Sequence, residues 1–331
     1  DTIGGCVAVP MFRTPLRSHG PSVFPGGNIT RASQRLDAGR RTPISWRDSA
    51  HRSHSLACRA VNEDAPVLIE KPRPHTTVIT LNRPERMNSM AFQLMVPLHE
   101  AFEEVAADND TTCVVLTGRG RGFCSGADTS SDGGAPPNVD GLTLTHIATR
   151  AMSLLADLVP AMQRMPQPII CAINGAAIGG GMCLTLGADI RLAGESAYFR
   201  AAGINNGLTA TELGLCFLLP RAIGSSRAFE LMLSGRDLDA HEAAAIGLVS
   251  RVVADDDLLD EALDLAEQIN GWSTQGTALT KRTMWAGLEM GSLRAAIEME
   301  THTQLFVRLT TENFEEAVRA RKEGRPPEFR D

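Results

Sequence analysis

The sequence lacks the features of membrane and nucleic-acid-binding proteins. No apolar run in the 331 residues reaches the length of roughly 18 residues that is needed to cross a bilayer. We therefore do not expect an integral membrane protein. Its net charge is −7, and Lys and Arg are dispersed through the main part of the chain, which disfavours nucleic acid as a partner. With 43% hydrophobic residues, the chain can bury one large core, or one core with a smaller appended unit.

The sequence also lacks paired cysteines and spaced histidines. No CxxC occurs among its seven cysteines (Cys6, Cys58, Cys113, Cys124, Cys171, Cys183 and Cys216), and the histidines are scattered. This pattern favours reduced, mostly buried thiols in a cytoplasmic protein over disulfides or a zinc site. We expect no metal ion.

Residues 1–64 differ in composition from the rest of the chain. They contain Arg but no Lys, few acids, and frequent Gly, Pro and Ser. Such a segment lacks the apolar periodicity of a core, so we predict a disordered N-terminal extension. An organelle transit peptide, which is also rich in Arg and Ser, is a second interpretation, and an extended reading frame is a third.

A regular pattern begins at residue 67. Residues 67–71 and 76–81 alternate as a hairpin-like pair of strands, residues 91–107 repeat apolar side chains at helical spacing, and residues 112–117 form a short apolar run. This strand-strand-helix-strand order predicts an α/β layer fold.

The chain is predicted to be almost entirely helical beyond residue 221. We place the core at residues 65–253 and a helical C-terminal region at 254–331, which is too short and too amphipathic to be independent. It is expected to cap the core or mediate assembly. The predicted helices cover residues 225–233, 240–246, 256–270, 275–290, 293–309 and 312–322.

Residues 118–128 form a Gly-rich segment that matches none of three common loops. A dinucleotide loop fails because Ser125 stands where the third Gly of GxGxxG belongs. A phosphate-binding loop fails for want of Gly-Lys-Ser/Thr, and Ser125 is not in a G-x-S-x-G elbow.

A second glycine-rich stretch follows a buried strand predicted at residues 168–173. After the Asn174-Gly175 turn, the glycines at 179–181 open a short helix. The unpaired N–H groups and positive dipole of a helix N-terminus suit negative charge. Alternatively, these glycines only relieve crowding at a corner.

Four segments together resemble the enoyl-CoA hydratase/isomerase family, the crotonases. They are LNRPERMNSM (81–90), GRGFCSGAD (120–128), AINGAAIGGGMCLTLGADIR (172–191) and SGRDLDAHEAAAIGLVSRVV (234–253). The resemblance covers the chain from about residue 67 to its C-terminus. It implies a crotonase-like spiral of ββα units with a C-terminal helical trimerisation region, and a homotrimer or hexamer. It also implies an acyl-CoA substrate in fatty-acid type metabolism, with coenzyme A as part of the substrate and no further cofactor.

The resemblance implies an oxyanion hole at Ala127 and Gly180. Crotonases stabilise a thioester enolate with two backbone N–H groups, and these residues match the two donors. Backbone donors need no side chain, which accounts for small residues at both positions. Each such donor contributes roughly 2.7–4 kcal/mol to an oxyanionic transition state.

The chain departs from the family's hydratases at both catalytic glutamates. The matching positions are Cys183 and Gly203, and neither supplies a carboxylate. Burial as a small apolar thiol is favoured over activation for Cys183. Glu212 lies, with a one-residue insertion, where some isomerases and dehalogenases of the family place a catalytic aspartate. A single carboxylate suits proton abstraction next to a thioester carbonyl. Alternatively, Glu212 is an acid at a helix N-terminus.

Three basic residues are matched to the nucleotide part of coenzyme A. The resemblance places Arg83 and Arg86 at the turn that borders the nucleotide, and Lys281 at a basic position that reaches the 3′-phosphate. Arg and Lys suit phosphate on charge grounds. Asp128, which follows a predicted donor, is expected to fix its loop by bonding backbone.

The missing glutamates favour isomerisation, or another enolate reaction, over ordinary hydration. The chain is thus expected to be an isomerase-like enzyme or an atypical hydratase. The alternative is a non-catalytic acyl-CoA-binding homologue that keeps the fold and the oxyanion hole.

Overall fold

A computed structural model describes residues 62–130 and 134–330, which belong to one compact unit. The predicted N-terminal extension, residues 1–64, lies almost wholly outside them. The strands are β1 Val67–Arg73, β2 Thr76–Leu81, β3 Cys113–Gly118, β4 Ile169–Ile173, β5 Ala176–Ile178, β6 Ile190–Gly194, β7 Tyr198–Arg200, β8 Leu238–Asp239 and β9 Arg251–Val253.

The helices alternate with strands in the first part of the chain and predominate towards the C-terminus. They are α1 Phe92–Ala106, α2 Leu144–Arg164, α3 Gly180–Gly187, α4 Leu215–Ile223, α5 Ser225–Ser234, α6 Ala240–Ala245, α7 Leu258–Asn270, α8 Thr274–Glu289, α9 Leu293–Thr310 and α10 Asn313–Glu323, with 3-10 turns η1 Pro84–Arg86, η2 Ile204–Asn206 and η3 Asp255–Asp257. Several begin after a side chain that accepts a bond from the N–H three residues on, as Asp239 Oδ1 does from Glu242 N at 2.8 Å.

The strands form two sheets. The larger has the order β1-β2-β3-β4-β6-β9, antiparallel between β1 and β2 and parallel elsewhere; the smaller has the order β5-β7-β8. Parallel neighbours require crossovers, and helices α1, α2 and α3 supply them. The sequence interpretation missed β5, β8 and β9, because strands of two or three residues are too short to show alternation. It also missed α4.

Alternating residues of β3 show how the larger sheet is covered on both faces. Cys113 and Val115 join a cluster with α7, whereas Val114 and Leu116 join the larger core that includes side chains of α1, α2 and α3. A strand buried on both faces reads as a continuous apolar run, as β3 and β4 do. The C-terminal region therefore contributes α7 to the core.

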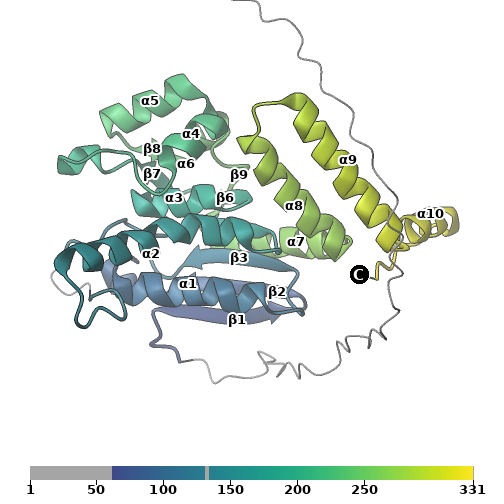
Figure 1. Cartoon of the computed structure of the whole chain (residues 1–331), viewed down its shortest axis with the longest axis horizontal. Helices are drawn as coiled ribbons and strands as arrows, with labels where there is room; N and C mark the ends of the chain where they lie inside the picture. Colours follow the sequence, from purple (N-terminus) through teal and green to yellow (C-terminus); the bar gives the residue numbers. More distant parts are fainter. Residues whose placement is uncertain (1–61, 131–133, 331) are drawn as a thin grey trace, which may run out of the picture. The chain divides into compact units, whose positions relative to one another are not determined.

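The helices beyond α7 are much more exposed. Helices α8 and α9 run side by side (Figure 1), and α9 buries none of its 18 residues. Its exposed apolar side chains are Leu293, Ile297, Leu305, Phe306 and Leu309. No helix in residues 62–130 and 134–330 is both long and apolar enough to cross a membrane.

Candidate active site

The segment that carries Ala127 is bonded on both sides of that residue to Met90. Met90 N donates to Gly126 O at 2.7 Å, and Asp128 N donates to Met90 O at 3.1 Å. Because the flanking groups face Met90, the N–H of Ala127 points to the opposite side. Ala127 itself is an exposed residue.

Two glycines bring this segment against the start of α3. Gly126 and Gly179 both adopt positive φ, 83° and 54°, which glycine tolerates without strain. A Cβ built on Gly126 would lie 2.7 Å from Ile178 O and 3.6 Å from Gly179 Cα, so only glycine allows this approach. Ala127 and Gly180 each directly follow one of these glycines. The structure therefore brings the two predicted donors to one place.

Gly180 opens helix α3, with Gly179 as its N-cap. Cys183 N donates to Gly179 O at 3.1 Å, which is the first bond of the helical ladder. The N–H groups of the first turn, that of Gly180 included, have no partner within the helix. This end of α3 also carries the positive end of the helix dipole.

Asp128 anchors the segment that follows Ala127. Its Oδ1 accepts bonds from Ser130 Oγ at 2.6 Å and Ser130 N at 2.9 Å, and its Oδ2 accepts from Ser89 Oγ at 3.0 Å and Arg83 Nη2 at 3.1 Å. These bonds, those from Ser130 above all, hold the pKa of Asp128 well below its ordinary value. Asp128 thus remains a carboxylate that fixes the loop, and Arg83 is one of its partners.

The carboxylate of Glu212 lies at the N-terminus of α3. Its Oε1 is 3.1 Å from the position that a Cβ on Gly179 would take. Among the described residues, no group forms a hydrogen bond or ion pair with this half-buried carboxylate. Burial alone raises the pKa of Glu212. Helix α4, which begins at Leu215, has no side-chain cap, so Glu212 does not cap it, and its carboxylate lies beside Gly179 instead.

The backbone of Glu212 is held from two sides. Its carbonyl oxygen accepts bonds from Leu215 N at 2.7 Å and from Cys183 Sγ at 3.4 Å. Burial, followed by the charge of Glu212, raises the pKa of Cys183 well above its ordinary value. Cys183 is therefore a buried thiol that contacts the Glu212 backbone and is unsuited to be a base or nucleophile.

Gly203 lies in a part of the chain that has no room for a side chain. A Cβ built there would overlap Thr209 O and lie 2.7 Å from Thr209 C. The segment between η2 and α4 folds directly over Gly203, so a glutamate at this position would require another path of the backbone. Three positions were compared for a catalytic carboxylate: Cys183, Gly203 and Glu212. Only Glu212 brings a carboxylate to the start of α3.

The structure gives Lys281 a role different from the phosphate contact expected of it. The side chain is 6% exposed. Its Nζ forms an ion pair with Asp189 Oδ2 at 2.9 Å and donates to the carbonyl oxygens of Met162 and Gln167, each at 2.9 Å. Burial lowers its pKa, partly opposed by Asp189. A lysine with these three internal partners ties α8 to α2 and to the residues just before β4 and β6.

The two arginines of the turn before α1 differ in exposure. Arg83 is largely buried and donates to Ser89 O at 2.9 Å as well as to Asp128. Arg86 is exposed, in η1. Of the three basic residues matched to coenzyme A, only Arg86 is an exposed residue.

Two residues at the site escaped the sequence interpretation. A Cβ on Gly180 would overlap Met90 Sδ and lie 3.4 Å from Leu213 Cδ1, so both side chains cover this glycine. Met90 belongs to a segment used for the resemblance, but nothing in that segment indicates what it touches. The position of Leu213 could not be predicted from the sequence, because its backbone has a φ of 45°, which is unusual for a branched residue.

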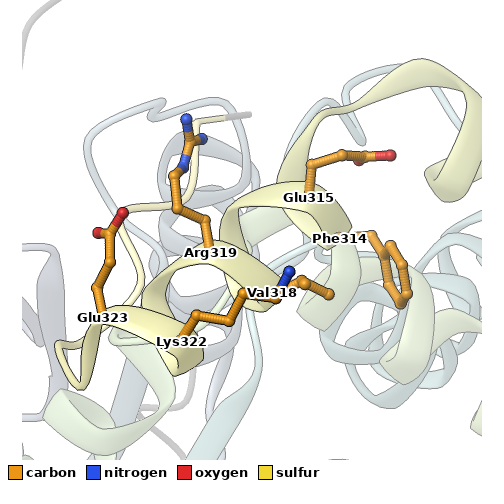
Figure 2. A pocket seen from close by; sticks show the side chains of 6 residues that line it. All are labelled: Phe314, Glu315, Val318, Arg319, Lys322 and Glu323. Carbon is orange, nitrogen blue, oxygen red and sulfur yellow. The ribbon is translucent and has the colours of Figure 1, made fainter.

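Surface pockets lie elsewhere on the described part of the chain. One lies along α10 and is lined by Phe314, Glu315, Val318, Arg319, Lys322 and Glu323 (Figure 2). Another lies at the turn with Arg83 and Arg119. Within residues 62–130 and 134–330, no three His, Cys, Asp or Glu side chains gather as metal ligands would.

Comparison with known proteins identifies the family. The model of the family described as enoyl-CoA hydratase/isomerase matches residues 75–331. The chain belongs to the enoyl-CoA hydratase/isomerase family. It is 61% identical over 265 residues to "Probable enoyl-CoA hydratase echA12" of Mycobacterium bovis, covering 80% of this chain and 93% of that protein.

Two solved structures of the family are also similar. The structure described as "a probable enoyl-CoA hydratase/isomerase from Mycobacterium abscessus", 55% identical, matches with a TM-score of 0.77 over 80% of this chain and 98% of its own. A monofunctional enoyl CoA isomerase from M. smegmatis, 51% identical, matches with a TM-score of 0.60 over 70% of this chain and 98% of its own. These matches confirm the predicted crotonase-like α/β fold. The names of the relatives include both hydratase and isomerase.

Proposed function

We propose that this chain is an acyl-CoA isomerase that stabilises a thioester enolate at Ala127 and Gly180 and uses Glu212 as its base. The observation that carries the proposal is the position of the Glu212 carboxylate. It lies against Gly179, it has no partner among the described residues, and burial raises its pKa. Cys183 and Gly203, which occupy the positions of the hydratase glutamates, supply no carboxylate.

The chemistry requires one base that gives back the proton it takes. Glu212 removes a proton from the carbon next to the thioester carbonyl, and the electrons of that C–H bond move into the carbonyl to form an enolate. The N–H groups of Ala127 and Gly180 hold the enolate oxygen. The protonated Glu212 then delivers its proton to the γ-carbon, which shifts the double bond without any added reactant. A raised pKa favours both halves of this transfer, because it makes the carboxylate a stronger base and lets its acid form persist until the proton is returned.

The arrangement does not favour ordinary hydration. Addition of water to an enoyl thioester requires groups that orient the water and move its protons, and this family's hydratases use two glutamates for that purpose. Here the position of one is a buried thiol and that of the other has no space for a side chain. An atypical hydratase and a non-catalytic acyl-CoA-binding protein remain the competing functions.

The assembly and setting of the enzyme belong to the same proposal. The unburied apolar side chains of α9 support a homotrimer or hexamer, since such a face is normally covered. Exposed Arg86 is the proposed phosphate contact of coenzyme A, with Arg83 acting through Asp128. We place the enzyme in fatty-acid type metabolism in the cytoplasm, with no cofactor apart from the coenzyme A of its substrate.

The direct test compares two reactions of the purified chain. We expect isomerisation of a 3-enoyl-CoA to its 2-enoyl isomer, with little hydration of crotonyl-CoA. Glu212→Gln keeps the shape of the side chain but cannot take a proton, so isomerisation should fall by about 10²–10⁴-fold. Glu195→Gln, an exposed glutamate after β6, is the matched control and should retain the rate.

Each competing function has its own outcome. Efficient hydration of crotonyl-CoA would show that the chain is a hydratase in spite of its missing glutamates. Tight binding of several acyl-CoA esters without turnover of any would favour the binding protein. Isomerisation that is equally fast in Glu212→Gln would exclude Glu212 as the base.

A further inference from the structure

An apolar wall covers the start of α3 beside Glu212. The wall consists of Met90 and Leu213. Met90 Sδ occupies the space that a Cβ on Gly180 would need, and Leu213 Cδ1 lies 3.4 Å from the same position. Met90 is buried and Leu213 is half-buried. The Glu212 carboxylate lies beside Gly179, the residue that precedes Gly180.

The chain reaches this arrangement through an unusual backbone. Leu213 and Gly214 are consecutive residues with positive φ, 45° and 85°. A leucine in this region is strained, and such strain persists only where the surrounding structure fixes it. The reversal places Leu213 over Gly180 while Glu212, its neighbour in sequence, faces Gly179.

Within residues 62–130 and 134–330, no charged side chain shifts the pKa of Glu212, which burial alone raises. The charge of Glu212 acts on the thiols of Cys183 and Cys124, and burial is the larger cause that raises the pKa of both. Both thiols therefore stay neutral. Among the described residues, burial rather than a neighbouring charge therefore sets the protonation of Glu212.

We infer that Met90 and Leu213 determine the outcome of the reaction by keeping water away from Glu212 and from the enolate held at Gly180. The inference rests on the proposed function. While the enolate exists, the proton taken from the substrate resides on Glu212. If water reaches that carboxyl group, the proton exchanges with solvent; behind an apolar wall, the same proton returns to the substrate at a different carbon.

The test measures how much solvent hydrogen enters the product. A 3-enoyl-CoA is isomerised in D₂O, and the deuterium content of the product is measured by mass spectrometry. We expect low incorporation in the unaltered chain. Leu213→Asn should raise it several-fold, because asparagine accepts positive φ and replaces the methyl groups with an amide that binds water. Met90→Gln, which keeps the unbranched shape, should act in the same direction.

Matched controls separate the wall from general effects of an added amide. Leu208→Asn makes the same change on the same segment, at a side chain that is 69% exposed. Met284→Gln makes the second change on α8, at a side chain that is 67% exposed. Both controls should leave the deuterium content unchanged. Equal deuterium content in Leu213→Asn, Met90→Gln and the unaltered chain would overturn the inference.

A second measurement does not depend on turnover. Titration of the Glu212 carboxyl carbon by NMR, in the free chain, should show a raised pKa that moves towards the ordinary glutamate value in Leu213→Asn and Met90→Gln. An unchanged pKa in both variants would refute the wall. If the pKa falls as expected but no acyl-CoA is isomerised, the wall exists and the proposed function is wrong.

Discussion

Replacing Lys281 by methionine distinguishes a buried structural lysine from a ligand of the coenzyme A phosphate. Methionine fills a similar volume but donates no hydrogen bond. The change leaves Asp189 without its cation and removes the donor to Met162 O and Gln167 O. Loss of one partner of a buried ion pair costs about 3–5 kcal/mol, so the free energy of unfolding should fall by about that amount.

The assay is urea unfolding at one fixed protein concentration, with the KM for an acyl-CoA measured in parallel. Lys322→Met, at an exposed position of α10, is the control and should change stability by less than about 0.5 kcal/mol. If Lys281 is structural, Lys281→Met should lose much stability. It should still distinguish an acyl-CoA from its 3′-dephospho analogue as well as the unaltered chain does. A variant of unchanged stability that no longer distinguishes the two esters would refute it.

Three further predictions concern the site. Gly203→Glu should destabilise the chain and bring no hydratase activity, because its Cβ overlaps Thr209 O; a gain of crotonyl-CoA hydration would contradict this. Of the five cysteines in the described residues, Cys216 is exposed and should be alkylated first by iodoacetamide at pH 8, whereas Cys183 should resist, as peptide mapping by mass spectrometry can check. Burial raises the pKa of folded Glu212, so its contribution to stability is present below the ordinary glutamate pKa and is lost as pH rises through the folded value. The free energy of unfolding of Glu212→Gln, measured between pH 4 and pH 8, should therefore lack this loss. An identical pH dependence of Glu212→Gln and the unaltered chain would count against a raised pKa.

The elements with clear periodicity could be predicted from the sequence, and the short ones could not. Strands β2, β3 and β4 and the long helices have apolar patterns of sufficient length. Strand β5 has three residues, and it pairs with β7 across an intervening helix, α3. Such a pairing depends on tertiary contacts that no local pattern records.

Part of the site could be predicted from the sequence. The glycines before Ala127 and Gly180 identified a place where backbone approaches closely, and the structure shows Gly126 against Gly179. The position of the Glu212 carboxylate could not be predicted, because the next residue, Leu213, has a positive φ that no local pattern indicates. The burial of Lys281 could not be predicted either, because its partners Asp189 and Met162 lie far away in sequence.

In the proposed mechanism, one carboxylate and two backbone donors meet at the start of α3. The measurement that tests it most directly is a crystal structure with an unreactive acyl-CoA analogue bound. We predict that the thioester oxygen lies about 2.7–3.1 Å from both Ala127 N and Gly180 N, with a Glu212 oxygen about 3 Å from the carbon next to the carbonyl. A thioester bound away from these N–H groups, or another carboxylate at that carbon, would contradict the proposed mechanism.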